Sequence, residues 1–368
     1  MRIGIDIRLY HYTGVGEYIK GLLQGLTQTD FKNEYMLLTQ TEDFEHIAVE
    51  NSKFTKLGVR LKPFSLTESI GLVLTLRKLK LRLFHSPHFV IPFHVKGSLL
   101  VTLHDLIPLR LPHVLDGRVL EYYRYMLKMV ARKAEIIIAV SNSTKADIID
   151  FLHVPEERIA VVYGGVREMF KPVGDIDLMK RVCLAYGISG RFVVYLGQWK
   201  PHKNVEGLIK AFDYVKERTE LPHKLVICGR TNSRYQKVRQ LVEKLDRQKD
   251  VIFVGFVSET DLPILLSAAD LLVYPSLYEG FGLPPLQAMA CGTPVITSNV
   301  ASLPEVVGDC GILISPYNTE ELSEAIIEIL TDEELHRDMV WKGLVRAKMF
   351  SCRDEALKTL ELYERMGH

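Results

Sequence analysis

Short apolar runs alternate with amphipathic stretches along the whole chain. The runs have the length and the β-branched content of buried strands. We predict strands over residues 2–7, 35–39, 99–103, 136–140, 192–196, 224–228, 251–254, 271–274 and 294–297. Apolar residues recurring at helical spacing predict helices over 16–27, 118–133, 143–152, 204–218, 233–248, 259–268, 320–331 and 352–366. This alternation is typical of α/β proteins, in which helices cover both faces of parallel sheets.

The rhythm is interrupted once, and the interruption predicts two domains. A chain of 368 residues is long for a single hydrophobic core. The stretch 166–190 is polar, and the alternation starts again near Phe192. Its turn residues are Pro172, Gly174, Gly187 and Gly190. We therefore expect an N-terminal domain of residues 1–170 and a C-terminal domain of residues 171–351.

Charge is balanced overall but uneven along the chain. The net charge of +1 gives no case for a nucleic-acid partner, yet residues 1–170 carry 22 Lys and Arg against 18 Asp and Glu. A solvated face and a basic, apolar membrane-surface patch both account for the two basic clusters of this half. The clusters are Arg60, Lys62, Arg77, Lys78, Lys80 and Arg82, and then Arg110, Arg118, Arg124, Lys128, Arg132 and Lys133.

Cysteine usage and hydropathy predict a cytoplasmic protein, with peripheral contact to a membrane as an option. The five cysteines are scattered, without metal-ligand or disulfide spacing, as in proteins of a reducing compartment. The chain begins directly with a strand, so we expect no signal peptide. The apolar runs are all shorter than the ~20 residues that span a bilayer.

The run from Tyr278 to Pro294 is the most informative motif. It connects the predicted strand 271–274 to a helix that begins near Leu286. Gly280 and Gly282 allow the backbone to approach a ligand closely, and a helix N-terminus attracts phosphate. The Glu279 carboxylate can accept hydrogen bonds from hydroxyl groups. Phosphate and hydroxyl recognition together suggest a nucleotide sugar as the ligand.

Continued through Val295–Asn299 to Leu303–Val307, this run resembles the signature of the retaining family 4 of nucleotide-sugar glycosyltransferases. The resemblance implies the GT-B fold, in which two Rossmann-like parallel-sheet domains face a cleft. It also implies that the final segment, 352–368, crosses back to the first domain. The donor would bind the second domain and the acceptor the first. Donor contacts are implied for Glu279, Gly280, Phe281, Gly282 and Leu283.

The loop after the first strand carries Gly14 and Gly16. A dinucleotide fingerprint would need a third glycine at position 19, where this chain has Ile19, and this disfavours a dehydrogenase. In the glycosyltransferase family a loop of this kind flanks the acceptor and the donor phosphates, whereas a plain tight turn is the alternative. Thr-Leu-His-Asp at the end of strand 99–103 resembles the family segment whose His, here His104, touches the transferred sugar. We expect Asp105 to cap the following helix.

The second domain departs from the family pattern at two positions. The family has an Arg after the glycine that ends the first strand and a Lys five residues later, but this chain has Gln198 and then Lys203. Lys200 or Arg230 could replace the missing cation. The carboxylate motif, usually two glutamates eight positions apart, here ends in Gln287, which can bond a ribose without charge assistance. Val254 and Phe256 lie in the segment that resembles the family's base-binding loop.

These observations predict a retaining GT-B glycosyltransferase that moves a hexose to a saccharide or lipid-linked acceptor. His104, Glu279 and Lys203 are the candidate catalytic residues, no Asp-x-Asp metal motif is present, and no metal or cofactor is expected. The opening Ile-Gly-Ile-Asp-Ile-Arg and the Thr-Gly-Val-Gly-Glu-Tyr loop most resemble the mannosyltransferase branch that builds lipopolysaccharide O-antigen. We therefore prefer GDP-mannose over a UDP-hexose as donor. The alternatives are a nucleotide-sugar epimerase and a degenerate member that only binds.

Overall fold

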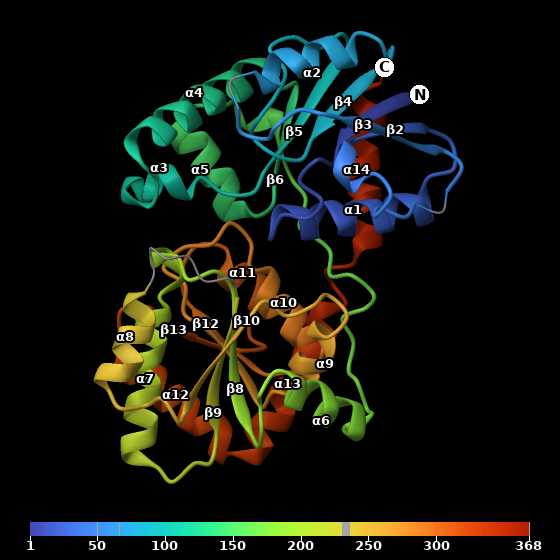
Figure 1. Cartoon of the computed structure of the whole chain (residues 1–368). Coiled ribbons are helices and arrows are strands. Elements are labelled where there is room, and N and C mark those ends of the chain that lie inside the picture. Colours follow the sequence, from blue (N-terminus) through green and yellow to red (C-terminus); the bar gives the residue numbers. More distant parts are fainter. Residues whose placement is uncertain (50, 66, 230–235, 368) are drawn as a thin grey trace. The chain divides into compact units, whose positions relative to one another are not determined.

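The computed structural model describes residues 1–49, 51–65, 67–229 and 236–367. It consists of two compact units. Unit 1 comprises Met1–Arg167 together with Phe350–His368, and unit 2 comprises Glu168–Met349. The chain therefore passes twice between the units, after Arg167 and after Met349. In each unit the strands run through the middle, with helices on both sides (Figure 1).

Unit 1 is built on a parallel sheet, in which seven strands of the described residues follow the order β3-β2-β1-β4-β5-β6-β7. The strands are β1 (Arg2–Asp6), β2 (Glu34–Gln40), β3 (Phe54–Val59), β4 (Leu83–Ser86), β5 (Ser98–Leu103), β6 (Ile136–Ala139) and β7 (Ile159–Val161). On one face α1 (Val15–Thr29) packs against α14 (Cys352–Met366), as Figure 1 shows in blue and red. On the other face, α2 (Glu68–Leu76), α4 (Gly117–Lys133) and α5 (Asn142–Leu152) contribute to one apolar core.

Unit 2 repeats this architecture with six parallel strands in the described residues, in the order β10-β9-β8-β11-β12-β13. They are β8 (Phe192–Leu196), β9 (Lys224–Cys228), β10 (Val251–Gly255), β11 (Leu271–Tyr274), β12 (Val295–Ser298) and β13 (Ile312–Ile314). Its longer helices are α6 (Ile176–Ala185), α7 (Val205–Arg218), α8 (Lys237–Lys244), α9 (Leu262–Ala268), α10 (Leu283–Ala290), α12 (Thr319–Thr331) and α13 (Glu333–Ala347). Helix α7 packs against α12, and α10 packs against α13.

Both sheets reverse their strand order at the first strand, between β1 and β4 in unit 1 and between β8 and β11 in unit 2. In open parallel sheets ligands bind outside the carboxyl ends of the strands at such a reversal. The central strands are buried along their whole length, for example β6 and β11. Their continuous apolar sequences are therefore explained by helices on both faces. A ligand site is therefore expected at the carboxyl edge of each sheet, beside β1 and β4 in unit 1 and beside β8 and β11 in unit 2.

The two connections between the units are tied together within unit 1. The Val166 amide donates to the carbonyl oxygen of Phe350 at 2.8 Å. The Gly165 amide donates to Oε2 of Glu355, a buried carboxylate of α14, at 2.7 Å. A Cβ atom on Gly165 would lie 2.4 Å from the Cys352 amide nitrogen, so only glycine allows this approach. The two connections to unit 2 therefore start from neighbouring segments of unit 1 that are hydrogen-bonded to each other.

The polar stretch 166–190, in which the sequence predicts the domain boundary, contains α6 of unit 2. Asp175 caps this helix, since its side chain accepts a hydrogen bond from the Leu178 amide. Residues 233–235 of the predicted helix 233–248 lie outside the described residues, and α8 spans Lys237–Lys244. None of the described helices combines the length and the apolar character needed to cross a membrane.

Candidate active site

A buried ion pair lies at the carboxyl edge of the sheet of unit 2. Lys203 ends a short 3-10 turn, Pro201–Lys203, that follows β8, and Glu279 lies in the loop between β11 and α10. The Nζ atom of Lys203 is 2.6 Å from Oε1 and 2.8 Å from Oε2 of Glu279. It also donates to Oη of Tyr274, at the end of β11, at 2.8 Å. The structure thus brings together two of the three candidate catalytic residues.

The pair keeps the Glu279 carboxylate charged. Burial alone would raise the pKa of Glu279, but the positive charge and hydrogen bonds of Lys203 outweigh this and hold the pKa below its ordinary value. An ammonium group has three N–H donors, and within the described residues Glu279 and Tyr274 receive them all. A diphosphate that binds Lys203 would therefore have to replace one of these acceptors.

The glycine-rich loop leads from this pair into α10. Gly282 is the N-cap of the helix, with φ +115°, and a Cβ atom there would lie 2.9 Å from a Leu303 methyl carbon. The buried Ser302 Oγ lies 3.0 Å from the Glu279 carbonyl oxygen and 2.7 Å from that of Phe281. Gly280 and Phe281 are buried with it, and Leu283 is the first residue of the helix. The loop is therefore held from behind. Because residues 284 and 285 are prolines, Leu283 is the only one of the first three helix residues with an N–H group.

The remaining predicted donor contacts follow other strands of the same edge. Gln198 lies in the loop after β8, where its carbonyl oxygen accepts a hydrogen bond from Tyr195 Oη at 3.0 Å. Val254 belongs to β10, and the side chain of Phe256 just beyond it is exposed. Gln287 lies on α10 with only 5% of its surface exposed. Arg230 lies outside the described residues.

Sequence reasoning did not anticipate how closely the loops of this edge pack. A Cβ atom on Gly229, directly after β9, would lie 1.8 Å from the carbonyl oxygen of Gly197. The Gly229 amide donates to the Gly255 carbonyl at 2.7 Å, and the Gly197 amide donates to the Cys228 carbonyl at 2.9 Å. The signal was present in the sequence, because each of these glycines stands at the end of a predicted strand.

The two glycines predicted in unit 1 differ in their surroundings. Gly14 is exposed, has φ +80° and precedes α1, and a Cβ atom there would meet nothing within 4 Å. Gly16 is buried in the first turn of α1, where a Cβ atom would lie 2.3 Å from the carbonyl oxygen of Tyr10. Packing alone thus explains glycine at position 16, whereas the open space beside Gly14 leaves room for a ligand.

His104 lies at the carboxyl end of β5, where its orientation and its proton are fixed. Its Nε2 atom is 2.8 Å from the carbonyl oxygen of Pro87, which can only accept, so Nε2 carries the proton and Nδ1 has the lone pair. Its ring packs edge-on against Tyr18, with the centroids 4.9 Å apart. Burial lowers the pKa of His104 to about 4. His104 is therefore a neutral side chain with one acceptor nitrogen.

His88, two residues after β4, belongs to a buried polar network. His88 Nε2 is 3.2 Å from Oδ2 of Asp6. Arg8 donates to Asp6 at 2.8 and 2.6 Å and to Oε1 of Glu68 at 2.6 Å. Burial alone would raise the pKa of Asp6, but the Arg8 charge holds it well below its usual range. The signal for this network was Asp6 and Arg8 at the end of an otherwise apolar strand.

The candidate residues thus form two groups, each at the carboxyl edge of its own sheet. Unit 1 presents Gly14, Gly16 and His104. Unit 2 presents Lys203, Glu279, the glycine loop, Gln287, Gln198, Val254 and Phe256. In the described part of the chain, no three His, Cys, Asp or Glu side chains gather in an arrangement that could hold a metal ion.

Comparisons with known proteins decide the family. Residues 12–168 match the family described as Glycosyltransferase Family 4, and residues 188–344 match the one described as Glycosyl transferases group 1. The O-antigen chain mannosyltransferase B of Escherichia coli is 30% identical over 371 residues, which cover 96% of this chain and 97% of that protein. The chain is a family 4 glycosyltransferase. The family and the transferase activity predicted from the sequence are confirmed.

Other relatives and solved structures agree. The O-antigen chain mannosyltransferase RfbU of Salmonella typhimurium is 32% identical over 63% of this chain and 61% of its own. Sucrose-phosphate synthase from Thermosynechococcus elongatus superposes with a TM-score of 0.81 at 21% identity, covering 99% of this chain and 98% of its own. WaaG, a glycosyltransferase of lipopolysaccharide biosynthesis, superposes with a TM-score of 0.77 at 16% identity, covering 98% and 99%. These structures confirm the predicted GT-B fold class of this family 4 glycosyltransferase.

Proposed function

We propose that this glycosyltransferase moves a mannosyl residue from GDP-mannose to a hydroxyl of a saccharide or lipid-linked acceptor, with retention of the α configuration. Support comes from the O-antigen chain mannosyltransferase B of Escherichia coli, which is similar over 96% of this chain. It also comes from the mannosyltransferase RfbU, whose similarity covers 63% of this chain. Both relatives are named O-antigen chain mannosyltransferases. We propose the same transfer of mannose, to an O-antigen chain, for this protein.

The observation that carries the proposal is the Lys203–Glu279 pair beside the N-terminus of α10. The Leu283 amide, the positive end of the α10 dipole and Lys203 would receive the diphosphate, because each offers positive charge to the growing negative charge of the leaving group. Glu279 uses only part of its acceptor capacity on Lys203 and keeps lone pairs for sugar hydroxyls. Gln287 would bond the ribose, while Gln198, Val254 and Phe256 would border the nucleotide.

Unit 1 would receive the acceptor and hold the transferred sugar. His104 can accept a hydrogen bond from a sugar hydroxyl at Nδ1, since Nε2 already donates to Pro87. Because its pKa is lowered to about 4, it is neutral at physiological pH and unsuited to relaying a proton from acceptor to solvent. We infer that the departing phosphate receives the proton of the acceptor hydroxyl, and that His104 orients the sugar.

Two alternatives concern the donor and the activity. The structure of HepE from Anabaena, with a TM-score of 0.80 at 18% identity and coverage of 99% and 100%, contains UDP and glucose, and a UDP-hexose would fit the same edge of unit 2. A binding protein without turnover is the second alternative. It is favoured by Gln287, which is buried where the family has a charged partner for the ribose.

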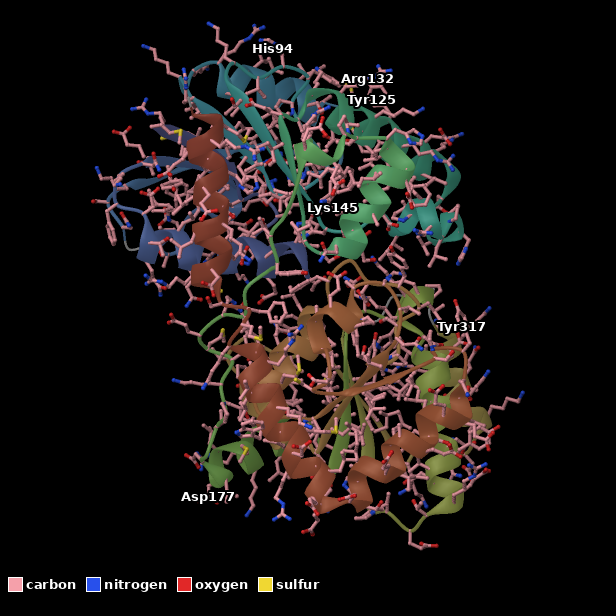
Figure 2. The ribbon with its side chains drawn as sticks, turned by 180° about the vertical axis from the view of Figure 1, so that it is seen from behind. His94, Tyr125, Arg132, Lys145, Asp177 and Tyr317 are labelled. Carbon is pink, nitrogen blue, oxygen red and sulfur yellow. The ribbon has the colours of Figure 1, made fainter. Side chains whose placement is uncertain are left out.

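We further propose that unit 1 touches the cytoplasmic surface of an anionic membrane. One side of α4 exposes four cations and two apolar side chains, Val119 and Tyr125, together with Glu121, which pairs with Arg124 at 2.6 Å. Tyr125 and Arg132 lie close together on the outer side of this helix (Figure 2). A helix with this pattern can lie in the headgroup region, where cations meet anionic lipid. The exposed cations are Arg118, Arg124, Lys128 and Arg132.

A melting assay followed by a transfer assay tests the proposal. A nucleotide that binds the folded state raises the melting temperature by mass action. We expect GDP to do so more strongly than UDP, equally with and without EDTA, and GDP-mannose to be consumed when an acceptor oligosaccharide is added. If UDP alone raised the melting temperature, the donor would be a UDP-hexose and not GDP-mannose. Binding of GDP-mannose without hydrolysis or transfer would favour the binding-only alternative.

A further inference from the structure

Four aromatic side chains form a row at the carboxyl edge of the sheet of unit 1. Tyr12 follows β1, Phe64 lies between β3 and α2, Phe89 follows β4 and Tyr123 belongs to α4. Neighbouring ring centroids are 6.1 Å apart for Tyr12 and Phe64, 5.7 Å for Phe64 and Phe89, and 4.8 Å for Phe89 and Tyr123. These spacings are those of favourable aromatic contacts. We refer to these four residues as the aromatic row.

The aromatic row is open at one end and buried at the other. Tyr12 is 49% exposed and Phe64 is 43% exposed, whereas Tyr123 is only 6% exposed. The buried end reaches the His104 loop, because Tyr123 Oη donates to the carbonyl oxygen of Asp105 at 3.1 Å. The segment of Phe89 reaches it as well, since Pro87 accepts the hydrogen bond of His104. The exposed rings are thus connected through packed side chains to the site residue of unit 1.

Phe64 is held in a strained conformation that exposes its ring. Its φ angle is +60°, in the left-handed region that bulky side chains rarely adopt. Its amide donates to Oε2 of Glu68 at 2.6 Å, and Oε1 of Glu68 is bound by the buried Arg8. The buried Asp6–Arg8–Glu68 network thereby stabilises the loop at Phe64. Neither strain nor exposure of an aromatic ring stabilises the fold, and such a combination points to a binding role.

We propose that Tyr12 and Phe64, supported by Phe89, form a stacking platform for a sugar ring of the acceptor. This rests on the proposed function, in which unit 1 receives a saccharide. A pyranose presents an apolar face of C–H groups that packs against the electron-rich face of an aromatic ring, while its hydroxyls stay hydrated at the rim. The platform would bind a ring of the acceptor chain beyond the one at His104, so that longer saccharides bind more tightly.

A membrane contact is the competing occupant, because Ile70 and Leu74 on the neighbouring α2 are also exposed. The observations favour a sugar for two reasons. The rings of the aromatic row are held in place by their mutual contacts, and the Arg8–Glu68 ion pair holds the loop of Phe64. Insertion of side chains into fluid lipid does not need such a fixed arrangement. The row also connects to the His104 loop, through the contact between Phe89 and Tyr123 and the hydrogen bond from Tyr123 to the Asp105 carbonyl oxygen.

The test uses a variant that suits the backbone. Phe64→Gly removes the ring and fits φ +60° without strain, so it should fold normally. Phe64→Tyr keeps a ring, and Leu74→Ala removes an exposed apolar side chain outside the row. Ligand-observed NMR with the full chain, without donor, would measure the affinity for soluble oligosaccharides that end in mannose, galactose, rhamnose or N-acetylglucosamine. We expect Phe64→Gly and Tyr12→Ala to weaken binding about fivefold or more, and Phe64→Tyr and Leu74→Ala to bind like the wild type.

Failure of this inference is separable from failure of the proposed function. If no oligosaccharide binds, or if Phe64→Gly binds like the wild type, the platform is wrong even where transfer proceeds with an unchanged acceptor KM. If Phe64→Gly loses binding to anionic vesicles and keeps its affinity for oligosaccharides, the row is a membrane contact. Ring-dependent oligosaccharide binding by a protein that transfers nothing would uphold the platform and contradict the proposed activity.

Discussion

At the scale of single residues, the buried ion pair of unit 2 determines which variants can test the site. Lys203 and Glu279 neutralise each other, and both are mostly buried. Removing one partner leaves the other charge buried and unpaired, which typically costs about 3–5 kcal/mol. A loss of activity in a single variant could therefore reflect unfolding, and the variants must be chosen with that in mind.

Lys203→Met should lower kcat about 100-fold or more, the scale of losing one preorganised partner of the leaving group. The matched control is Lys210→Met, which removes an exposed lysine of α7 in the same unit. The double variant Lys203→Met/Glu279→Gln removes both charges and should recover stability without recovering activity. Single-turnover transfer beside thermal melting distinguishes these effects, and near-normal transfer by Lys203→Met would contradict the role of Lys203.

Gln287→Glu tests the departure from the family pattern. If Gln287 bonds the ribose, the new carboxylate should tighten nucleotide binding by about 1 kcal/mol, because charge-assisted hydrogen bonds are stronger. If position 287 instead faces the protein interior, a charge at this buried site should lower the free energy of unfolding without any gain in affinity. Calorimetric titration with GDP beside chemical denaturation tells the two outcomes apart.

Glu355 should make stability depend on pH. Burial raises the pKa of Glu355 to about 8, although the hydrogen bond from the Gly165 amide opposes the shift. The folded state therefore holds a proton that the unfolded state releases near pH 4.5, so the free energy of unfolding should fall as the pH rises from about 4.5 to 8. The limiting slope for one proton is about 1.4 kcal/mol per pH unit.

Glu355→Gln should flatten this dependence and unfold at higher denaturant concentration than the wild type at pH 8. The amide keeps an acceptor for the Gly165 amide and carries no charge. Urea denaturation of both proteins at several pH values provides the measurement. Parallel pH profiles for the two proteins would show that Glu355 is charged throughout this range.

Helices with one buried face and strands with both faces buried were predictable from the sequence, because burial produces a regular pattern of apolar residues. Strands such as β9 and β11 have the predicted bounds, because continuous apolar residues suit the middle of a parallel sheet. The sequence did not reveal α6, whose Ile176 and Leu184 are largely exposed and blur the helical pattern. It also missed short edge strands such as β7 and β13, whose pairing depends on distant partners.

The site was predictable where a motif lies in one continuous segment, as with Glu279 and the glycine loop. It was not predictable where the partners are far apart in the sequence. The Arg8–Glu68 ion pair spans 60 positions, and the contact between Tyr12 and Phe64 joins two different loops. Such contacts depend on strand order, which local patterns do not determine.

We expect α4 to bind anionic vesicles in a salt-sensitive manner. Its exposed cations should each contribute up to about 1 kcal/mol near an anionic surface, and Arg124 less because Glu121 pairs with it. Salt screens this attraction within a Debye length. Replacing Arg124, Lys128 and Arg132 by glutamine should reduce recovery with phosphatidylserine vesicles at low salt. Replacing two exposed lysines of unit 2, Lys210 and Lys348, by glutamine provides the control. Equal recovery with anionic and neutral vesicles would leave α4 an ordinary solvated helix.

At the scale of the whole molecule, we propose that the two units of the same doubly wound architecture divide the chemistry. Unit 2 presents the charges suited to a diphosphate, and unit 1 presents His104 and the aromatic row. Each unit folds around its own sheet, so a variant in one site should leave the binding function of the other intact. Nucleotide affinity and sugar transfer are therefore separable readouts of the same preparation.

The most direct test of the account is single-turnover transfer from GDP-mannose by the wild type and by Glu279→Ala, with GDP affinity measured calorimetrically on the same preparations. Glu279 is assigned to the sugar and not to the nucleotide. The account predicts that the variant binds GDP about as well as the wild type and transfers about 100-fold more slowly or worse. His104→Ala should behave in the same way. Near-wild-type transfer by Glu279→Ala would contradict the assignment of the site.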